Sequence, residues 1–168
     1  MEEKNLVELA RNGDRQAFAK LYETVYQDLY RFALFTMKNK EEAEDAVSES
    51  VIAAYESIHK LRKVESFRSW MFQIVANQCK KIWKRREHFL DRTMAEKAGE
   101  IFEMEEHLDL WFSFSCLTEK ERMVLAMHVF GGYNSQEIGR LLKMAPGTVR
   151  SLKSRAVVRM RHMLGGIV

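Results

Sequence analysis

Residues 134–160 read NSQEIGRLLKMAPGTVRSLKSRAVVRM, a stretch with the signals for two helices joined by a tight turn. Asn134, with Glu137 three residues later, predicts a capped helix with a short apolar stripe. Pro146 stands at a predicted first helical position, where its missing N–H is not needed, and a basic helix follows to about Leu164. This order predicts a helix-turn-helix, whose second helix enters the major groove of DNA. A plain helical hairpin is the alternative.

Further helix starts are predicted towards the N-terminus. A residue whose side chain can accept a main-chain N–H precedes each of four stretches; these residues are Asp14, Asn39, Ser66 and Thr118. The first two stretches and the one after Ser66 carry apolar residues at helical spacing. Asn39 and Thr118 are each followed three residues later by a glutamate, as in a capping box. The chain has one proline and little alternation of Val, Thr and Ile, so the sequence predicts an all-helical protein.

Composition excludes several classes of protein. The 168 residues are 46% hydrophobic and 11% aromatic, which is typical of one ordinary domain or two small ones and not of a disordered chain. No apolar run reaches the roughly 18 residues of a membrane span, and the N-terminus does not resemble a signal peptide. We therefore expect a cytoplasmic protein.

The chemistry-bearing residues give no sign of an enzyme. Cys79 and Cys116 lack the paired Cys/His spacing of a zinc site, and the five histidines are scattered. No glycine-rich phosphate loop or nucleophile motif is present. We expect no catalysis, no metal and no cofactor.

Charge is segregated along the chain, although the net charge is only +3. Residues 41–56 contain six acids and no Lys or Arg, whereas 57–92 contain ten bases against three acids. Residues 93–109 are acidic again, and every charged residue after Glu137 is a Lys or Arg. Two basic zones separated by an acidic stretch favour two contacts with a polyanion. The alternative is that each run is a solvated helix face.

Two parts of the chain resemble one family. The runs LTEKER (117–122), GYNSQEIG (132–139) and GTVRS (147–151) are similar to region four of bacterial sigma factors. The runs EAEDAVSE (42–49) and FRSWMFQIVAN (67–77) resemble region two. Both occur in family order, which resembles the two-domain extracytoplasmic-function (ECF) group. The resemblance implies two small helical domains: region two at 1–90, an acidic linker at 91–110 and the region-four helix-turn-helix at 111–168.

The resemblance implies a sigma factor that binds core RNA polymerase and directs promoter-specific initiation, with promoter DNA and an anti-sigma protein as further partners. The family segment that docks on the polymerase clamp corresponds to an acidic helix face, and complementary charge would speed that association. The residues so implied are Glu42, Glu44, Asp45, Ser48 and Glu49. A solvated acidic face is the alternative.

The family handles the melted minus-ten element with the loop at about 61–67 and the helix that follows. A flipped base needs an aromatic or amide-lined pocket with cations for its phosphates. The residues of these types are Arg62, Lys63, Phe67, Arg68, Trp70, Gln73, Asn77, Lys80 and Lys84. Phe67 and Trp70 could equally pack in the core. Unlike many family members, this chain has no glycine in the loop.

For the minus-thirty-five element, the resemblance implies that the second helix presents Thr148, Arg150, Ser151, Ser154 and Arg155 to DNA. Arginine can pair with guanine through two hydrogen bonds, and a threonine at a helix start suits a phosphate. The order Leu152-Lys153 reverses the usual family order and moves a base towards the buried side. In the turn, Lys143 replaces a residue that tolerates left-handed geometry, commonly glycine.

A stand-alone helix-turn-helix regulator, which binds duplex DNA without polymerase, is the competing interpretation. It explains residues 111–168 but gives no role to the acidic helix or to the aromatic and amide face. Removing residues 1–90 would leave operator binding intact if this interpretation is right, and would abolish promoter selection if the chain is a sigma factor.

Overall fold

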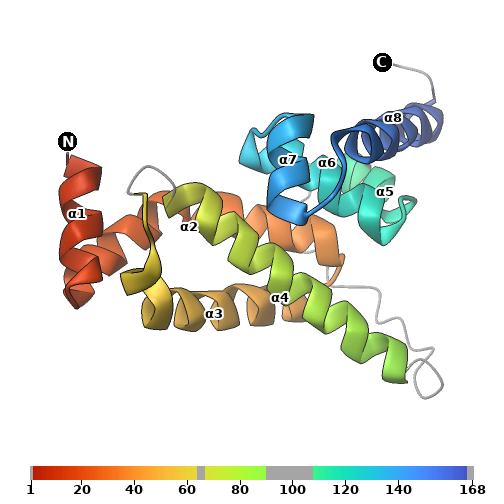
Figure 1. The fold of residues 1–168 in the computed structure, drawn as a ribbon. Helices are drawn as coiled ribbons and strands as arrows, with labels where there is room; N and C mark the ends of the chain where they lie inside the picture. Colours follow the sequence, from red (N-terminus) through yellow and green to blue (C-terminus); the bar gives the residue numbers. More distant parts are fainter. Residues whose placement is uncertain (1, 64–66, 90–107, 166–168) are drawn as a thin grey trace.

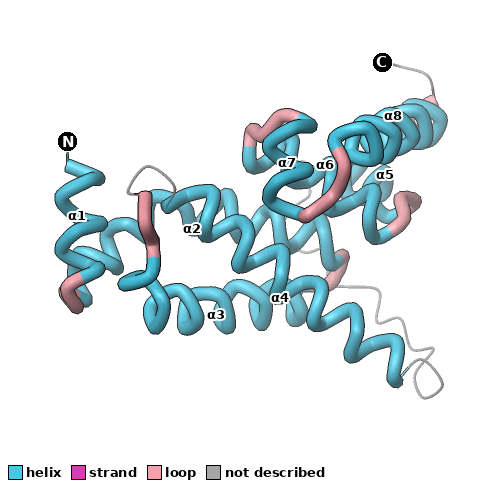
Figure 2. The backbone as a smooth tube through the Cα atoms, viewed as in Figure 1, coloured by secondary structure: helices cyan, strands magenta, loops and turns pink. Residues whose placement is uncertain are grey.

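The computed structural model describes residues 2–63, 67–89 and 108–165. In those ranges the chain forms helices and turns without strands, as Figure 2 shows, so the all-helical prediction is confirmed. Within the same ranges, none of the helices is both long enough and apolar enough to cross a bilayer. The helices are α1 (Glu2–Arg11), α2 (Arg15–Met37), α3 (Lys40–Ser57), the 3-10 helix η1 (Ile58–Lys60), α4 (Phe67–Phe89), α5 (Leu108–Ser115), α6 (Glu119–Gly131), α7 (Ser135–Leu142) and α8 (Pro146–Met163).

Side-chain caps set most of the predicted helix starts. Asp14 Oδ1 accepts from the main-chain N of Gln16 at 2.9 Å and of Ala17 at 3.1 Å, and so begins α2. Asn39, Thr118 and Asn134 likewise cap α3, α6 and α7. The prediction for Ser66 lies outside the described residues. Helix α1 was not predicted, although its Val7 and Ala10 are buried three residues apart.

We call α1 to α4 the N-terminal module and α5 to α8 the C-terminal module. In Figure 1, α3 and α4 lie along α2, and α1 packs across the N-terminal end of α2. Phe32 on α2 and Phe72 on α4 are fully buried, with ring centroids 5.6 Å apart. In the C-terminal module, α8 packs against α6 and α7. The expected acidic linker at 91–110 lies outside the described residues except at 108–110, which belong to α5.

The two modules pack against each other through an aromatic contact. Helix α6 lies along α2, and α7 lies beside α4 (Figure 1). Phe35 of α2 is 1% exposed and its ring centroid lies 5.0 Å from that of Phe114 and 4.9 Å from that of Phe130. Phe72 of α4 meets the ring of Tyr133 edge-on at 5.5 Å. These rings bury apolar surface between the modules, which is the main favourable term in their association.

Candidate nucleic-acid interface

The turn between α7 and α8 is fixed by local geometry. Asn134 and Glu137 form a complete capping box. Asn134 Oδ1 accepts from the main-chain N of Glu137 at 2.9 Å, and Glu137 Oε2 accepts from the main-chain N of Asn134 at 2.8 Å. Lys143 ends α7 in the left-handed region at φ +57°, as the position required. Gly139 is buried, and a Cβ there would lie 2.7 Å from the main-chain oxygen of Met144. Only glycine therefore fits this close approach without a shift.

Helix α8 has one buried side and one exposed side, as the sequence predicted. Val149 and Ala156 are fully buried against the rest of the C-terminal module. On the other side, Arg150, Ser151, Ser154 and Arg155 are exposed and line a shallow groove together with Gly147. Thr148 is also exposed, in the first turn of α8. The structure therefore brings all five predicted minus-thirty-five residues to the surface of the N-terminal part of one helix.

The side chain of Lys153 turns towards the protein rather than towards the exposed face. It is half-buried, and its Nζ lies 3.5 Å from Nδ1 of His128 on α6. The same His128 nitrogen lies 2.9 Å from the carbonyl oxygen of Tyr133, which can only accept a hydrogen bond, so Nδ1 carries the proton. Lys153 is thus half-buried, as the reversed order of residues 152 and 153 predicted.

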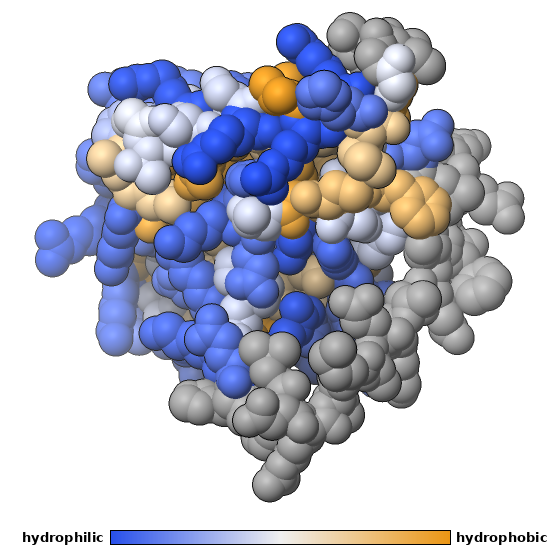
Figure 3. Space-filling view, turned by 90° about the vertical axis from the view of Figure 1, so that its right-hand side faces the viewer, coloured by the Kyte–Doolittle hydropathy of each residue, from blue (hydrophilic) through white to orange (hydrophobic). Residues whose placement is uncertain are grey.

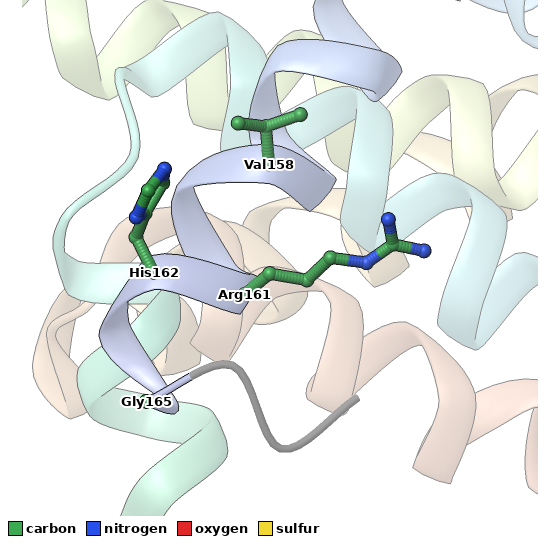
Figure 4. Close-up of a pocket in the computed structure, with 4 residues that line it drawn as sticks. All are labelled: Val158, Arg161, His162 and Gly165. Atoms are coloured by element: carbon green, nitrogen blue, oxygen red, sulfur yellow. The ribbon is translucent and has the colours of Figure 1, made fainter.

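The C-terminal end of α8 carries a second hollow with different residues. Figure 4 shows Val158, Arg161, His162 and Gly165 around it, with the arginine extended away from the other side chains. Hydrophilic side chains cover most of the described surface at this end of the molecule, with smaller hydrophobic patches between them (Figure 3). This hollow shares no residue with the groove along the N-terminal half of α8.

Residues predicted for the minus-ten element divide into exposed, partly buried and buried groups. Arg62, Lys63, Asn77 and Lys84 are exposed, whereas Trp70 and Gln73 are half-buried. Phe67 is fully buried and lies between the rings of Phe18, at 6.5 Å, and Trp70, at 6.3 Å. Phe67 therefore packs in the core, which was the alternative for this residue, while Trp70 lies at the edge between core and surface.

Arg68 and Lys80, the remaining minus-ten candidates, contact the C-terminal module. Arg68 donates to the main-chain oxygens of Phe130 at 3.2 Å and Gly131 at 3.3 Å, and pairs with Asp28 at 3.1 Å. Its guanidinium also lies 4.9 Å from the ring centroid of Phe72.

The Nζ of Lys80 lies 3.4 Å from the main-chain oxygen of Leu142. Desolvation lowers the pKa of Lys80, and the neighbouring Lys143, Lys120 and Lys84 lower it further by charge repulsion. Lysines from both modules therefore lie near one another at this point.

The acidic face of α3 is exposed over most of its predicted extent. Glu44, Asp45, Ser48 and Glu49 all lie on the surface. Glu42 differs, because its carboxylate accepts two hydrogen bonds from Arg86 of α4. The hydrogen bond to Glu42 raises the pKa of Arg86 above its usual value. Within the part of the chain that the structure describes, the other four predicted docking residues make no such ion pair with another helix.

A cluster of polar contacts at the C-terminal end of α2 escaped the sequence analysis. Arg122 is 5% exposed; it donates to the main-chain oxygen of Thr36 at 2.9 Å and of Leu117 at 2.7 Å. Burial lowers the pKa of Arg122 to about 10. Lys38 donates to the main-chain oxygen of Ser115 at 2.8 Å. No local pattern marks the contacts with Thr36 and Ser115, because these main-chain acceptors are far from their donors in the sequence.

Comparisons with known proteins agree on one family. Residues 21–89 match the family described as Sigma-70 region 2, and residues 114–162 match Sigma-70, region 4. The ECF RNA polymerase sigma factor SigM of Mycobacterium tuberculosis is 26% identical over 91% of this chain and 80% of its own length. SigW of Bacillus subtilis is 24% identical over 96% of both chains.

Solved structures show the same fold. CnrH, solved in complex with the cytosolic domain of CnrY, is similar with a TM-score of 0.74 over the whole of both chains, at 19% identity. RpoE of Bartonella quintana, solved with the anti-sigma factor NepR, has the same TM-score and identity over 90% of this chain and 98% of its own.

Proposed function

Because this chain belongs to the sigma-70 family, in the ECF group of RNA polymerase sigma factors, we propose that it binds core RNA polymerase through α3, and promoter DNA through α4 and α8. Its function is to direct promoter-specific initiation of transcription. This role rests on binding and strand separation, and no chemical step is assigned to the chain. The proposed localisation is the cytoplasm, where the polymerase acts.

The observation that carries the proposal is that one chain exposes two surfaces of opposite charge. Helix α3 exposes an acidic face that contains Asp45 and Glu49, and α8 exposes a basic face that contains Arg150 and Arg155. A regulator that binds only DNA has no use for the acidic face, because like charges repel the phosphates. A factor that joins polymerase to DNA needs both.

Arg150 and Arg155 read bases of the minus-thirty-five element in the major groove, and Ser151 and Ser154 add hydrogen bonds to base edges or phosphates. Thr148, in the first turn of α8, contacts a phosphate, where the helix N-terminus favours negative charge. The shallow groove along this part of α8 supports this assignment.

The minus-ten element lies along α4 in this proposal. Trp70, Gln73 and Asn77 offer an aromatic and amide surface for an unstacked base, and Lys84 is exposed about two turns beyond Asn77 for a phosphate. Arg62 and Lys63 supply cations from the loop before α4. Phe67 supports this surface from within the core through its ring contact with Trp70.

The domain limits follow from the same assignment. We place region two at 1–90, the acidic linker at 91–110 and region four at 111–168. The first three residues of α5 then belong to the linker. An anti-sigma protein that covers the polymerase-binding and DNA-binding surfaces is the proposed regulator. The resemblance of the fold to that of the sigma factor RpoE, which was solved with the anti-sigma factor NepR, supports this partner.

Capture of purified core RNA polymerase tests the proposal. Wild-type protein should retain the polymerase, and the Asp45→Lys, Glu49→Lys double variant should lose it. The matched control is Glu8→Lys, Glu23→Lys, which makes the same change in charge at exposed positions of α1 and α2. Loss of capture in both variants would point to net charge rather than to α3. Failure of the wild type itself would favour the stand-alone regulator.

A further inference from the structure

A buried carboxylate joins α6 to the helix that carries the minus-thirty-five candidates. The side chain of Glu121, in the first turn of α6, is 2% exposed, and its Oε1 lies 3.3 Å from Nη1 of Arg159 on α8. The arginine side chain is 48% exposed. Oε2 of Glu121 is buried too, and within the described part of the chain it has no hydrogen-bond partner. The pair is therefore buried at its acidic end and open to solvent at its basic end.

The surroundings of Glu121 do not favour an acid. Met123 and Val124, which follow it in α6, are buried in the hydrophobic core. Removing a carboxylate from water costs free energy that one ion pair often fails to recover, and apolar side chains of similar size can replace such a pair without loss of stability. The dipole of α6 does not require the acid either, because Glu119 already places a negative charge in the same turn. Stability alone therefore does not explain Glu121.

Apolar packing alone does not hold α8 in one orientation. The side chains that α8 buries, Val149, Leu152 and Ala156, are small or flexible, and the hydrophobic effect is non-directional. The ion pair is directional, because it links one atom of α6 to one atom of α8. Arg159 lies about 15 Å along the helix axis from Val149, so the pair constrains the half of α8 that is remote from the turn at Gly139.

The orientation of α8 determines where its exposed arginines point. Arg155 lies one helical turn before Arg159, and Arg150 is on the same helix, so a rotation of α8 about its axis displaces both candidates together. Base recognition by arginine depends on two parallel hydrogen bonds to guanine. Such a site needs its groups held within about 0.5 Å and 10–20° of the productive geometry.

We propose that Glu121 is a positioning residue for DNA recognition, which through Arg159 fixes the rotation of α8 on the C-terminal module and so sets where Arg150 and Arg155 meet the bases. This inference rests on the function proposed for α8. Neither Glu121 nor Arg159 contacts a base in this assignment. The buried carboxylate lowers stability and raises sequence discrimination.

Removing one charge, and then both, tests the proposal in the full chain assembled with core RNA polymerase. Arg159→Met keeps an apolar stem but leaves Glu121 unpaired. The double variant Glu121→Met, Arg159→Met replaces the pair by two apolar side chains. The matched control is Glu119→Met, Arg161→Met, which makes the same substitutions at exposed positions of the same two helices.

Two quantities are measured for each variant. The first is the thermal unfolding temperature of the free protein. The second is discrimination, which we define as the ratio of holoenzyme affinity for the preferred minus-thirty-five sequence to its affinity for single-base changes in that sequence.

The two quantities should respond differently to the double variant. Arg159→Met should lower both, because it leaves a buried charge without its partner. In Glu121→Met, Arg159→Met the unfolding temperature should return to that of wild type or exceed it, whereas discrimination should stay reduced by about fivefold or more. The control should keep wild-type discrimination. If discrimination recovers together with stability in the double variant, the pair serves only the fold and the proposal is overturned.

A second double variant guards against misfolding of the first. Glu121→Gln, Arg159→Met removes both charges and keeps the shape of the buried side chain; it decides the question if circular dichroism shows that the first is unfolded. Wild-type discrimination in this folded variant would overturn the positioning role alone. A wild-type holoenzyme that captures polymerase but shows no minus-thirty-five preference would instead contradict the function proposed for α8, and this inference with it.

Discussion

Glu42 on α3 and Arg86 on α4 form an ion pair joined by two hydrogen bonds. Arg86 Nε donates to Glu42 Oε1 at 2.8 Å, and the second bond runs from Nη2 to Oε2. Nη2 also lies 3.3 Å from the main-chain oxygen of Met37 at the end of α2. Arg86 therefore ties together the ends of three helix segments, and the carboxylate of Glu42 is committed to the fold, unlike that of the exposed Glu44.

Replacing Glu42 should cost stability, whereas replacing its neighbour should not. In Glu42→Ala we expect the free energy of unfolding to fall by about 1–2 kcal/mol, because a partly buried Arg86 loses its partner. Glu44→Ala should stay within about 0.5 kcal/mol of wild type. Urea unfolding followed by circular dichroism measures both. Equal losses in the two variants would show that the ion pair contributes nothing specific.

The close approach at Gly139 predicts a sharp difference between two glycines. Gly139→Ala should lower the free energy of unfolding by about 1–3 kcal/mol, since the added methyl would meet the Met144 carbonyl oxygen at 2.7 Å. Gly147→Ala is the control, because the nearest atom to its Cβ is a side-chain nitrogen of Arg150 at 3.9 Å. Thermal unfolding compares them, and an unperturbed Gly139→Ala would contradict the packing of the turn.

The exposed arginines of α8 should determine sequence preference. Holoenzyme is assembled, its preferred DNA is selected from a random pool, and binding to single-base changes is measured for Arg150→Ala and Arg155→Ala. Each arginine that pairs with a base should lose about 1–3 kcal/mol of discrimination at one position. Arg161→Ala, further along the same helix, should leave that discrimination intact. A uniform weakening on every sequence would identify phosphate contacts instead.

The two cysteines should differ in reactivity. Cys79 is fully buried, and its burial, with the charge of Glu42, raises the pKa of its thiol to about 12. The thiolate is the reactive form, so the Cys79 thiol stays protonated and inert near pH 8. Cys116 is exposed. A thiol-reactive chromophore should therefore label one thiol rapidly in the native protein and both in urea; rapid labelling of both without denaturant would show that α4 opens.

Local patterns predicted the helix starts but not the partners of the acids beside them. The sequence marks Asn39 with Glu42 and Thr118 with Glu121 as capping boxes, and both cap residues accept the expected main-chain hydrogen bond. Their acids point elsewhere. Glu42 pairs with Arg86, and the buried Glu121 lies 3.3 Å from Arg159 of α8. A distant arginine competes for such a carboxylate, and its approach depends on tertiary packing that a local pattern does not contain.

The exposed face of α8 could be predicted because helical periodicity alone separates Arg150 from Val149. The contact between the two modules could not. Helical spacing predicts that α4 has a buried side, but it does not say that Tyr133 of the other module covers Phe72. For the same reason Arg68 and Lys80 were assigned to DNA without any sign of their contacts with the ends of α6 and α7.

Several basic side chains that reach from one module to the other contact main-chain oxygens, which every amino acid possesses. The acceptors are Thr36 for Arg122, Ser115 for Lys38 and Leu142 for Lys80. Substitutions at Thr36, Ser115 or Leu142 that preserve the helices therefore leave an acceptor in place, and no compensating change is demanded of the basic donor. Related chains can keep this contact while their residues at the acceptor positions drift freely. A search for pairs of positions that change together would therefore not detect these polar contacts between the modules. Only conservation of the basic donors would indicate them.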